Sequence, residues 1–546
     1  MLNMTVSDHV VFTTHNGKET VMEIRWQKNG PVIGSPRQTL NSFSSDIHAR
    51  QAGWEERLVQ DSAVFHDVQL DIQRHFNQGA DRLTAALLAR VTQRPEMQAH
   101  VQRVRQNAVV PLQSPERRPL KLRLLSGLVV WLSVLYCPPR SHGVKRTDDQ
   151  EQLAGLYPEL AALGIRHGDS PALQALVART MALCPSIAAA RKELRRQGLK
   201  LDTKTVRRIA EQLGTEFLAW RRRELLAWRL GLVPAGVELA GCRVAVQIDG
   251  GRVRVRENTK RSAKRKKGQR RKFKTPWREP KALIIYVFDT QGKRDKHHLP
   301  LIDGTLLGPD HLAELVAWHL HRLGAAKAET VVFVSDGAPW IWDRLDWIIG
   351  RAGLDAARTV RVLDWCHAVE HISRALTLLK LKAPARCMAF VEMRTLLKQS
   401  RYAEIVAELE RLAGKRWKKH KVWTEIRYLR KHGEAGHLQY LTFKRRGLPF
   451  GSGAIESTIR RVINLRLKSN ATYWLAENAE AVFALRAALL SDRWESMLSA
   501  VQQSMSRDAR LTWQWSPPTI SPDATVPTPP KPPEVQRPQV IGGIAA

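Results

Sequence analysis

The order of apolar segments in the second half of the chain predicts an α/β core built on a mixed sheet. Three short runs rich in apolar and β-branched residues follow one another closely, and then a helical pattern alternates with two further runs. Three closely joined strands, followed by helix, strand, helix and strand, form the order of the ribonuclease-H-like fold. The expected strands span 243–251, 282–290, 296–304, 330–340 and 359–367, with a helix over 311–324.

The remainder of the chain predicts mostly helical units around this core. With 546 residues, the chain suggests roughly three or four units of about 150 residues each. We expect a mostly helical N-terminal region (1–115), a hairpin plus helix-turn-helix region (116–240), the first part of the core (241–375), an all-α insertion (376–449), the last part of the core (450–500) and a Pro-rich disordered tail (501–546).

The charge of the chain predicts a polyanionic partner. The formal net charge is +35, from 87 Lys and Arg against 52 Asp and Glu. Double-stranded DNA fits this charge because basic side chains that neutralise phosphates release condensed counterions. A membrane surface is the competing explanation, but no helix combines a basic face with a bulky apolar face. The apolar runs are too short to span a bilayer, so we expect no membrane contact and a cytoplasmic, nucleoid-associated location in a bacterium.

A helix-turn-helix is predicted ahead of the core. Ser186 is a plausible N-cap for the first helix, which ends at Gly198, and Asp202 or Thr203 caps a second helix that stops at Gly214. The second helix presents Lys204, Arg207 and Arg208 near its start, where a recognition helix meets DNA. Two surface helices with solvated charges are the alternative interpretation.

Two further basic segments lie next to the predicted core strands. The stretch from Arg252 to Lys281, between the first two strands, contains the run KRSAKRKKGQRRKFK and is expected to track phosphates as an arm. A second basic set follows Glu456 on one predicted helix. The expected DNA-binding residues in these segments are Arg252, Arg254, Lys266, Lys267, Arg270, Arg271, Arg460, Arg461, Arg466 and Lys468.

Two aspartates stand at strand ends that the predicted topology makes neighbours. Asp249 ends the first strand and Asp336 the fourth, and each precedes a glycine. Two carboxylates at one sheet edge repel each other unless a cation lies between them, and oxygen ligands suit Mg²⁺ or Mn²⁺. A strand-end Asp before Gly is also a common turn residue, which is the structural explanation for either position alone.

A third carboxylate is expected to complete the site. Glu456, in GLPFGSGAIESTIRRVINLRLK, lies just inside a helix that follows a Gly-Ser-Gly loop. Glu477 and Glu480 are rivals on a later, less basic helix, and Glu456 itself could be a helix-dipole residue. The long stretch between Asp336 and Glu456 has a helical pattern, so we interpret it as the all-α insertion.

The core region resembles the DDE transposases of bacterial insertion sequences, most closely the ISKra-type group and more distantly the Mutator-like lineage. The resemblance is carried by VQIDGGRVRVRE, KTPWREPKALIIYVFD, VFVSDGAPWIW, DWCHAVEHI and GSGAIESTIRRVINLRLK. It implies that Asp249, Asp336 and Glu456 form a catalytic and metal-binding triad for two Mg²⁺ (or Mn²⁺) ions. It also implies DNA end cleavage and strand transfer by a homo-oligomer on paired element ends.

The motif DWCH adds two accessory candidates. Asp364 and His367 are similar to the (C/D)xxH signature of transposases that carry a helical insertion, and this resemblance implies that the histidine helps to organise the target or flanking strand near the cut. Without the resemblance, the two residues are a helix cap and a helix-start histidine. Two other functions stay open: a ribonuclease-H-like structure-specific nuclease that cuts without joining, and a domesticated non-catalytic DNA-binding protein.

Overall fold

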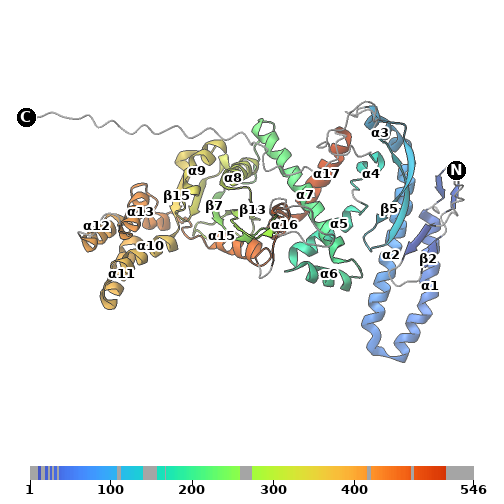
Figure 1. Cartoon of the computed structure of the whole chain (residues 1–546), viewed down its shortest axis with the longest axis horizontal. Helices are drawn as coiled ribbons and strands as arrows, with labels where there is room; N and C mark the ends of the chain where they lie inside the picture. The colour runs from blue at the N-terminus through green and yellow to red at the C-terminus, as the bar shows by residue number, and fades with distance from the viewer. Residues whose placement is uncertain are drawn as a thin grey trace, which may run out of the picture.

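The computed structural model describes residues 10–13, 19–22, 25–27, 30–32, 36–106, 112–138, 156–165, 168–258, 273–414, 420–468 and 472–511. The molecule is elongated (Figure 1), with long N-terminal helices at one end and a group of short helices at the other. A sheet lies between the two ends. The predicted basic residues Lys266, Lys267, Arg270 and Arg271 and the Pro-rich stretch from Ser516 to Ala546 fall outside the described residues.

The central sheet has five strands in the order β13-β12-β7-β14-β15. β7 pairs antiparallel with β12 on one side and parallel with β14 on the other. β13 extends the sheet antiparallel to β12, and β15 extends it parallel to β14. The predicted mixed sheet, with its first and fourth strands as neighbours, is therefore confirmed. The bounds are Arg243–Gly250 (β7), Lys281–Val287 (β12), Leu301–Thr305 (β13), Thr330–Ser335 (β14) and Thr359–Leu363 (β15).

Helices bury both faces of this sheet. Successive strand side chains point to opposite faces, and in β7 Val244 and Val246 join one hydrophobic core while Ala245 joins the other. Helices α8 (Pro309–Leu323) and α9 (Pro339–Arg351) cover the first face. Helices α15 (Gly453–Thr458) and α16 (Ala476–Leu490) cover the second. Burial on both faces explains why the strands are nearly continuous apolar runs.

The N-terminal region combines long helices with small antiparallel pairs. Its helices are α1 (Pro36–Gln60), α2 (Phe65–Thr92) and α3 (Pro95–Gln106), with a 3-10 turn, η1 (Ser62–Val64). The predicted hairpin is present as β5 (Glu116–Arg123) and β6 (Val129–Tyr136). Ser126 lies in the turn of this hairpin, and its backbone N–H and hydroxyl both donate hydrogen bonds to Asp81 of α2. Four short strands precede the helices: β1 (Val10–Thr13), β2 (Glu19–Met22), β3 (Arg25–Gln27) and β4 (Gly30–Val32).

The helical unit ahead of the core has the predicted caps but a longer last helix. Ser186 caps α6 (Ile187–Arg196) by accepting from Ala189 N–H, and Asp202 caps α7 by accepting from Lys204 and Thr205 N–H. The predicted end at Gly214 is wrong, because α7 runs over Thr203–Arg229. Gly214 instead permits close helix packing, since a Cβ there would lie 2.7 Å from Ala481 Cβ of α16. Helices α4 (Pro158–Ala162) and α5 (Pro171–Leu183) precede this pair.

The stretch between β15 and α15 is helical, as predicted for the insertion. Its helices are α10 (Trp365–Leu378), α11 (Ala383–Lys398), α12 (Tyr402–Ala413), α13 (Val422–Glu434) and α14 (Tyr440–Arg445). After α15 the chain continues into a π-helical segment, η4 (Ile459–Asn464). The predicted tail boundary at residue 501 is wrong, because α17 spans Trp494–Leu511 and buries Val501. Two 3-10 turns, η2 (Ala325–Lys327) and η3 (Ala356–Arg358), complete the described helical elements.

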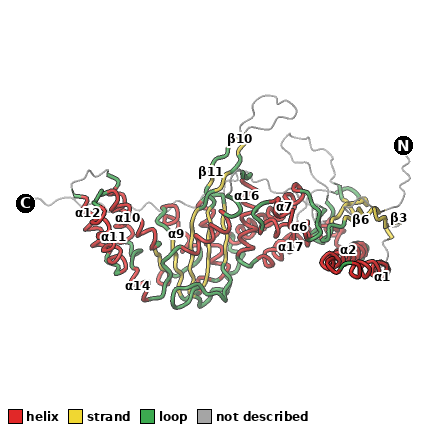
Figure 2. The backbone as a smooth tube through the Cα atoms, turned by 90° about the horizontal axis from the view of Figure 1, so that it is seen from below, coloured by secondary structure: helices red, strands yellow, loops and turns green. Residues whose placement is uncertain are grey.

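A small β ribbon projects from the end of β7. Strand β8 (Val253–Arg254) pairs with β11 (Trp277–Arg278), and β9 (Glu257–Asn258) pairs with β10 (Phe273–Lys274). Figure 2 shows β10 and β11 standing out from the body of the molecule. The ribbon contains the described ends of the segment predicted to be a basic arm.

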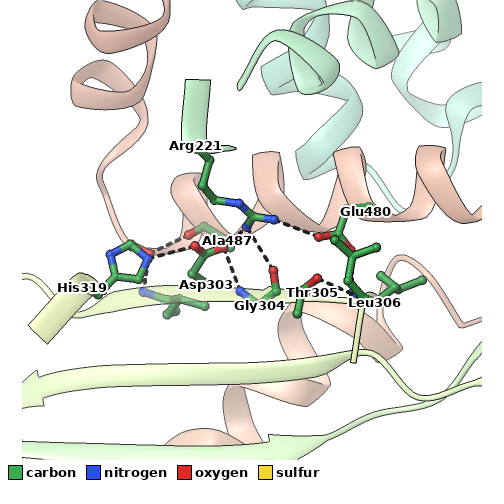
Figure 3. Close-up of polar contacts among 11 residues, drawn as sticks. Arg221, Asp303, Gly304, Thr305, Leu306, His319, Glu480 and Ala487 are labelled. Atoms are coloured by element: carbon green, nitrogen blue, oxygen red, sulfur yellow. Dashed lines mark hydrogen bonds and ion pairs between the residues drawn. The ribbon is translucent and has the colours of Figure 1, made fainter. Parts of the chain in front are cut away.

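A buried ion network joins α7 to the edge of the sheet (Figure 3). Arg221 donates to Asp303 of β13 at 2.7 Å and to Glu480 of α16 at 2.8 Å. His319 of α8 contacts the second oxygen of Asp303 at 2.9 Å. Burial alone would raise the pKa of Asp303, but Arg221 and His319 lower it to about 2. The network therefore fixes the helical unit to the sheet through the two buried ion pairs of Arg221.

We predict that Arg221→Met destabilises the protein by about 3–5 kcal/mol, because it leaves two buried carboxylates without their cation. The measurement is the free energy of unfolding in urea. Arg223→Met, on the exposed side of the same helix, is the matched control and should change stability little. Equal effects of the two substitutions would contradict the role given to the buried network.

The same network predicts a loss of stability in acid. Burial lowers the pKa of His319 to about 4 from its ordinary 6.5, despite the opposing effect of Asp303. The unfolded chain therefore takes up a proton at His319 before the folded chain does, so this group destabilises the fold as pH falls from about 6.5 to 4. Melting temperature measured against pH should fall more steeply in this window for the wild type than for His319→Gln. Parallel curves would show that His319 does not contribute.

Candidate active site at one edge of the sheet

Parallel pairing of β7 and β14 brings the two strand-end aspartates together. Ser335 is in register with Ile248, so the residues that follow, Asp336 and Asp249, leave the two strands side by side. Both carboxylates are partly buried. Asp249 accepts a hydrogen bond from Gly250 N–H at 2.6 Å, and Asp336 accepts one from Ala338 N–H at 3.2 Å. Each acid thus uses one oxygen to order its own turn.

The electrostatics of the pair are those of crowded acids. Burial, with smaller contributions from the carboxylates of Asp336 and Glu456, raises the pKa of Asp249 to about 6, against the lowering effects of Gly250 N–H and His367. The pKa of Asp336 is also raised, first by burial and then by Asp364 and Glu279. Like charges held together in this way are stabilised by a bound cation. The predicted strand-end acids therefore share one electrostatic site with the predicted glutamate.

Glu456 reaches this site from the first turn of α15. Its carboxylate accepts a hydrogen bond from Ser452 Oγ at 2.6 Å. The loop before it is held by Gln247 of β7, which donates to Gly451 C=O at 2.9 Å and accepts from Ile455 N–H at 3.0 Å. Gln247 is fully buried two residues before Asp249, so one strand positions both the first acid and the third.

Asp364 strengthens the same loop. One of its oxygens caps α10 by accepting from His367 N–H at 2.8 Å, and the other accepts from Ser452 N–H at 2.6 Å. The side chain is buried. The capping interpretation therefore describes its geometry, and Asp364 acts on the site through the loop that carries Glu456.

His367 lies on the carboxylate side of α10. Its positive charge, when present, lowers the pKa of both Asp249 and Asp336, so the ring is close to the pair. Its own side chain is 37% exposed and lies 3.8 Å from Glu370. Of the two accessory candidates, His367 is therefore the one with a ring available at the site.

A tyrosine from the insertion also reaches the site. Tyr428 of α13 packs against Gly337, where a Cβ would lie 1.7 Å from its hydroxyl oxygen. Its ring stacks on His371 with centroids 3.6 Å apart, and His371 in turn contacts Glu425 at 2.5 Å. Burial raises the pKa of Tyr428, and so does the Asp336 carboxylate. The glycine after Asp336 is thus required by the docking of the insertion.

The donor chemistry of the three acids fits a hard divalent cation. Among the described residues no three His, Cys, Asp or Glu side chains already stand in a ready metal-binding group. Asp249, Asp336 and Glu456 nevertheless offer only oxygen ligands, which Mg²⁺ and Mn²⁺ prefer. The pKa of Asp249 is raised mainly by burial and, to a smaller extent, by the carboxylates of Asp336 and Glu456; a bound cation would offset both effects.

Some of the basic residues predicted to contact DNA are at least partly exposed to solvent, and others are paired or buried inside the protein. Lys204, Arg207, Arg252, Arg460 and Lys468 are exposed, and Arg254 and Arg461 are partly so. Arg208 instead donates to the buried carboxylate of Asp169 at 2.6 Å. The prediction for Arg466 is wrong, because its side chain is buried and donates to Met181 C=O and Sδ. Whether a basic side chain faces solvent or the protein interior depends on its position around the helix, and the number of charges in the sequence does not give that position.

Of the rival acids, Glu480 forms the buried ion pair with Arg221, and Glu477 faces solvent at the start of α16.

Four residues near the site were not predicted from the sequence: Gln247, Glu279, Lys281 and Tyr428. Gln247 carried a visible signal, because it is the one polar residue inside the apolar run VAVQI. Lys281 pairs with Glu279 at 3.0 Å beside Gly250.

Comparison with known proteins gives no relative for this chain: no family profile, no curated protein and no solved structure matches it.

Among the described residues, no helix has both the length and the apolar composition needed to cross a membrane.

Replacement of Gln247 by Leu is expected to loosen the loop that holds Glu456. The substitution removes the hydrogen bonds that Gln247 donates to Gly451 C=O and accepts from Ile455 N–H. Ile455 N–H keeps a second acceptor, Ser452 C=O at 3.0 Å, and each lost hydrogen bond contributes about 0.5–1.5 kcal/mol. Amide hydrogen exchange should speed up at Ile455, while amides of β14 keep their protection. If both exchange rates rise together, Gln247 supports the whole sheet and not this loop in particular.

Proposed function

We propose that the protein is a DNA transposase of the DDE type, which cleaves element ends and transfers them to target DNA. The observation that carries the proposal is the convergence of Asp249, Asp336, Glu456 and His367 at one sheet edge. These residues come from four separate segments of the chain. The net charge of +35 supports double-stranded DNA as the substrate.

A ribonuclease-H-like core is part of this proposal. The strand order β13-β12-β7-β14-β15 supports it. In this sheet β7 is antiparallel to β12 and parallel to β14. The helical insertion between β15 and the helix of Glu456 supports the proposal as well. The segments that carry the resemblance to insertion-sequence transposases are those that supply the site. Assembly as a homo-oligomer on paired ends rests on the resemblance.

The chain's own residues have distinct roles in the proposed reaction. Asp249, Asp336 and Glu456 would hold two Mg²⁺ or Mn²⁺ ions, which supply activation of water and stabilisation of the departing 3′-oxygen when bound. Gln247, Ser452 and Asp364 fix the position of Glu456. Exposed cations on the neighbouring elements, Arg252, Arg460 and Lys468, bind the phosphate backbone on either side of the cut.

One site can serve both chemical steps. In cleavage, water attacks the phosphodiester at the element end, the P–O3′ bond breaks and a 3′-OH is released. In strand transfer, that 3′-OH attacks a phosphodiester of the target and displaces the target's own 3′-oxygen. Both steps exchange one P–O bond for another, so neither needs a covalent intermediate with the protein.

The test is cleavage of labelled element ends in Mg²⁺. Asp249→Asn, Asp336→Asn and Glu456→Gln should each lower the rate by about 10³-fold or more, because each removes a ligand from a metal site that contributes several kcal/mol. Asp343→Asn, an exposed acid on α9, is the control and should cleave normally. Full cleavage by Asp249→Asn would refute the assignment of the triad.

Joining of pre-cleaved ends to a plasmid separates a transposase from a nuclease with the same site. A transposase makes joined product from a free 3′-OH end, and the same acid substitutions abolish it. Cleavage without any joined product would replace the proposal by a structure-specific nuclease. Binding to ends with neither reaction in the wild type would indicate a DNA-binding protein without catalytic activity.

A further inference from the structure

The β ribbon beside the candidate active site has two chemically different faces. Along GRVRVRE the side chains alternate, so that Val253 and Val255 are fully buried while arginines occupy the other face. Alternation follows from the strand geometry, in which every second side chain shares a face. Arg252, Arg254 and Arg256 therefore form one basic row along the ribbon.

Aromatic rings accompany this row. The guanidinium of Arg254 lies 4.7 Å from the centre of the Trp277 ring, and that of Arg256 lies 4.3 Å from the centre of the Phe273 ring. Tyr473 meets Phe273 edge to face at 6.0 Å. The three aromatic residues are 47%, 40% and 40% exposed for Trp277, Phe273 and Tyr473. A monomer gains nothing by exposing three clustered rings, so this face fits a ligand.

The ribbon is fixed relative to the acids. Its first strand continues from β7 just after Asp249, and Gly251 packs so closely on η4 that a Cβ there would lie 2.6 Å from Ile463. Arg256 N–H donates to Trp474 C=O at 2.7 Å, and Trp474 N–H donates to Arg254 C=O at 3.1 Å. Trp277 is in register with Arg254. At about 3.3 Å per residue this places Trp277 roughly 16 Å beyond Asp249, and Phe273, which is in register with Asn258, lies farther along the ribbon.

Two properties of this face identify the ligand. Exposed aromatic rings bind bases by stacking. A base inside a duplex cannot stack on a protein ring, because neighbouring bases already cover both of its faces. Guanidinium groups that lie beside aromatic rings still have N–H groups that can donate to phosphate oxygens. Aromatic stacking surfaces interleaved with cations are the features of a single-strand site.

We propose that Trp277, Phe273 and Tyr473, with Arg254 and Arg256, form a binding site for unpaired nucleotides of the DNA strand that leaves the active site. Bases stack on the rings, and phosphates contact the arginines. This inference rests on the proposed function, since it takes the same DNA as its ligand.

The experiment measures fluorescence anisotropy of a labelled duplex that carries a single-stranded oligothymidine tail, without divalent metal so that nothing is cut. The double variant Trp277→Ala Phe273→Ala should bind the tailed duplex about fivefold or more weakly than the wild type, because stacking contributes about 1–3 kcal/mol per base. Affinity for the blunt duplex should not change. An abasic tail should weaken wild-type binding by the same factor and have no further effect on the variant.

The control is Trp131→Ala. Trp131 is 36% exposed on the β5–β6 hairpin and has Lys121 5.3 Å from its ring centre, so it matches the chemistry of the ribbon at another place. It should leave binding of the tail unchanged. Melting temperatures of both variants establish that they fold.

Equal weakening on tailed and blunt duplexes, or no weakening, would overturn the proposal. So would a change in oligomeric state of the ribbon variant in sedimentation, because the rings would then form an interface between copies. The proposed function fails separately: Asp249→Asn should keep tail binding while it loses cleavage. A wild type that binds the tail as expected but never cuts element ends would remove the transposase assignment and leave the single-strand site.

Discussion

A buried polar side chain must find a partner, and this constraint joins the distant parts of the molecule. Gln247 in β7 has partners in the loop before α15, in α15 itself and in β12, and Asp303 in β13 has its partners in α7 and α8. Asp364 has one in the same loop before α15. In each case the group would be left without a partner if the loop or helix moved away, and an unpaired buried polar group costs about 1–3 kcal/mol. These contacts from the sheet therefore help to determine where segments far along the chain lie.

The candidate active site is a product of this arrangement. Two acids come from adjacent strand ends, but the third lies beyond the helical insertion, and the contacts of Gln247 and Asp364, with the apolar packing of α15 on the sheet, return it to the same edge. The insertion also contributes directly, because Tyr428 packs on Gly337 next to Asp336. A change in the packing of the insertion would therefore reach the acids through Gly337 and through the start of α15.

The positive charge of the chain does not form one uniform surface. Arg221 and Arg466 are buried and structural, and Arg208 is paired with a buried aspartate. Exposed cations remain near the start of α7, on the helix of Glu456 and along the ribbon. On the ribbon they are combined with exposed rings, which distinguishes this face from a surface that only attracts phosphates.

The sequence was enough to predict the order of the five strands, their mixed pairing, the hairpin, the cap at Ser186 and the placement of Asp249 beside Asp336. These features depend on local periodicity and on the order of elements, which are readable along the chain. Two strand bounds were wrong, because β13 begins at Leu301 and β14 ends at Ser335, and the cap at Asp202 was one of two alternatives. Tertiary structure alone decided that α7 continues through Gly214, that Arg466 is buried and that Gln247 and Tyr428 support the site. Such features depend on which side of a helix or strand meets a partner far away in sequence. The local pattern of residues is the same whether the side chain meets that partner or faces solvent.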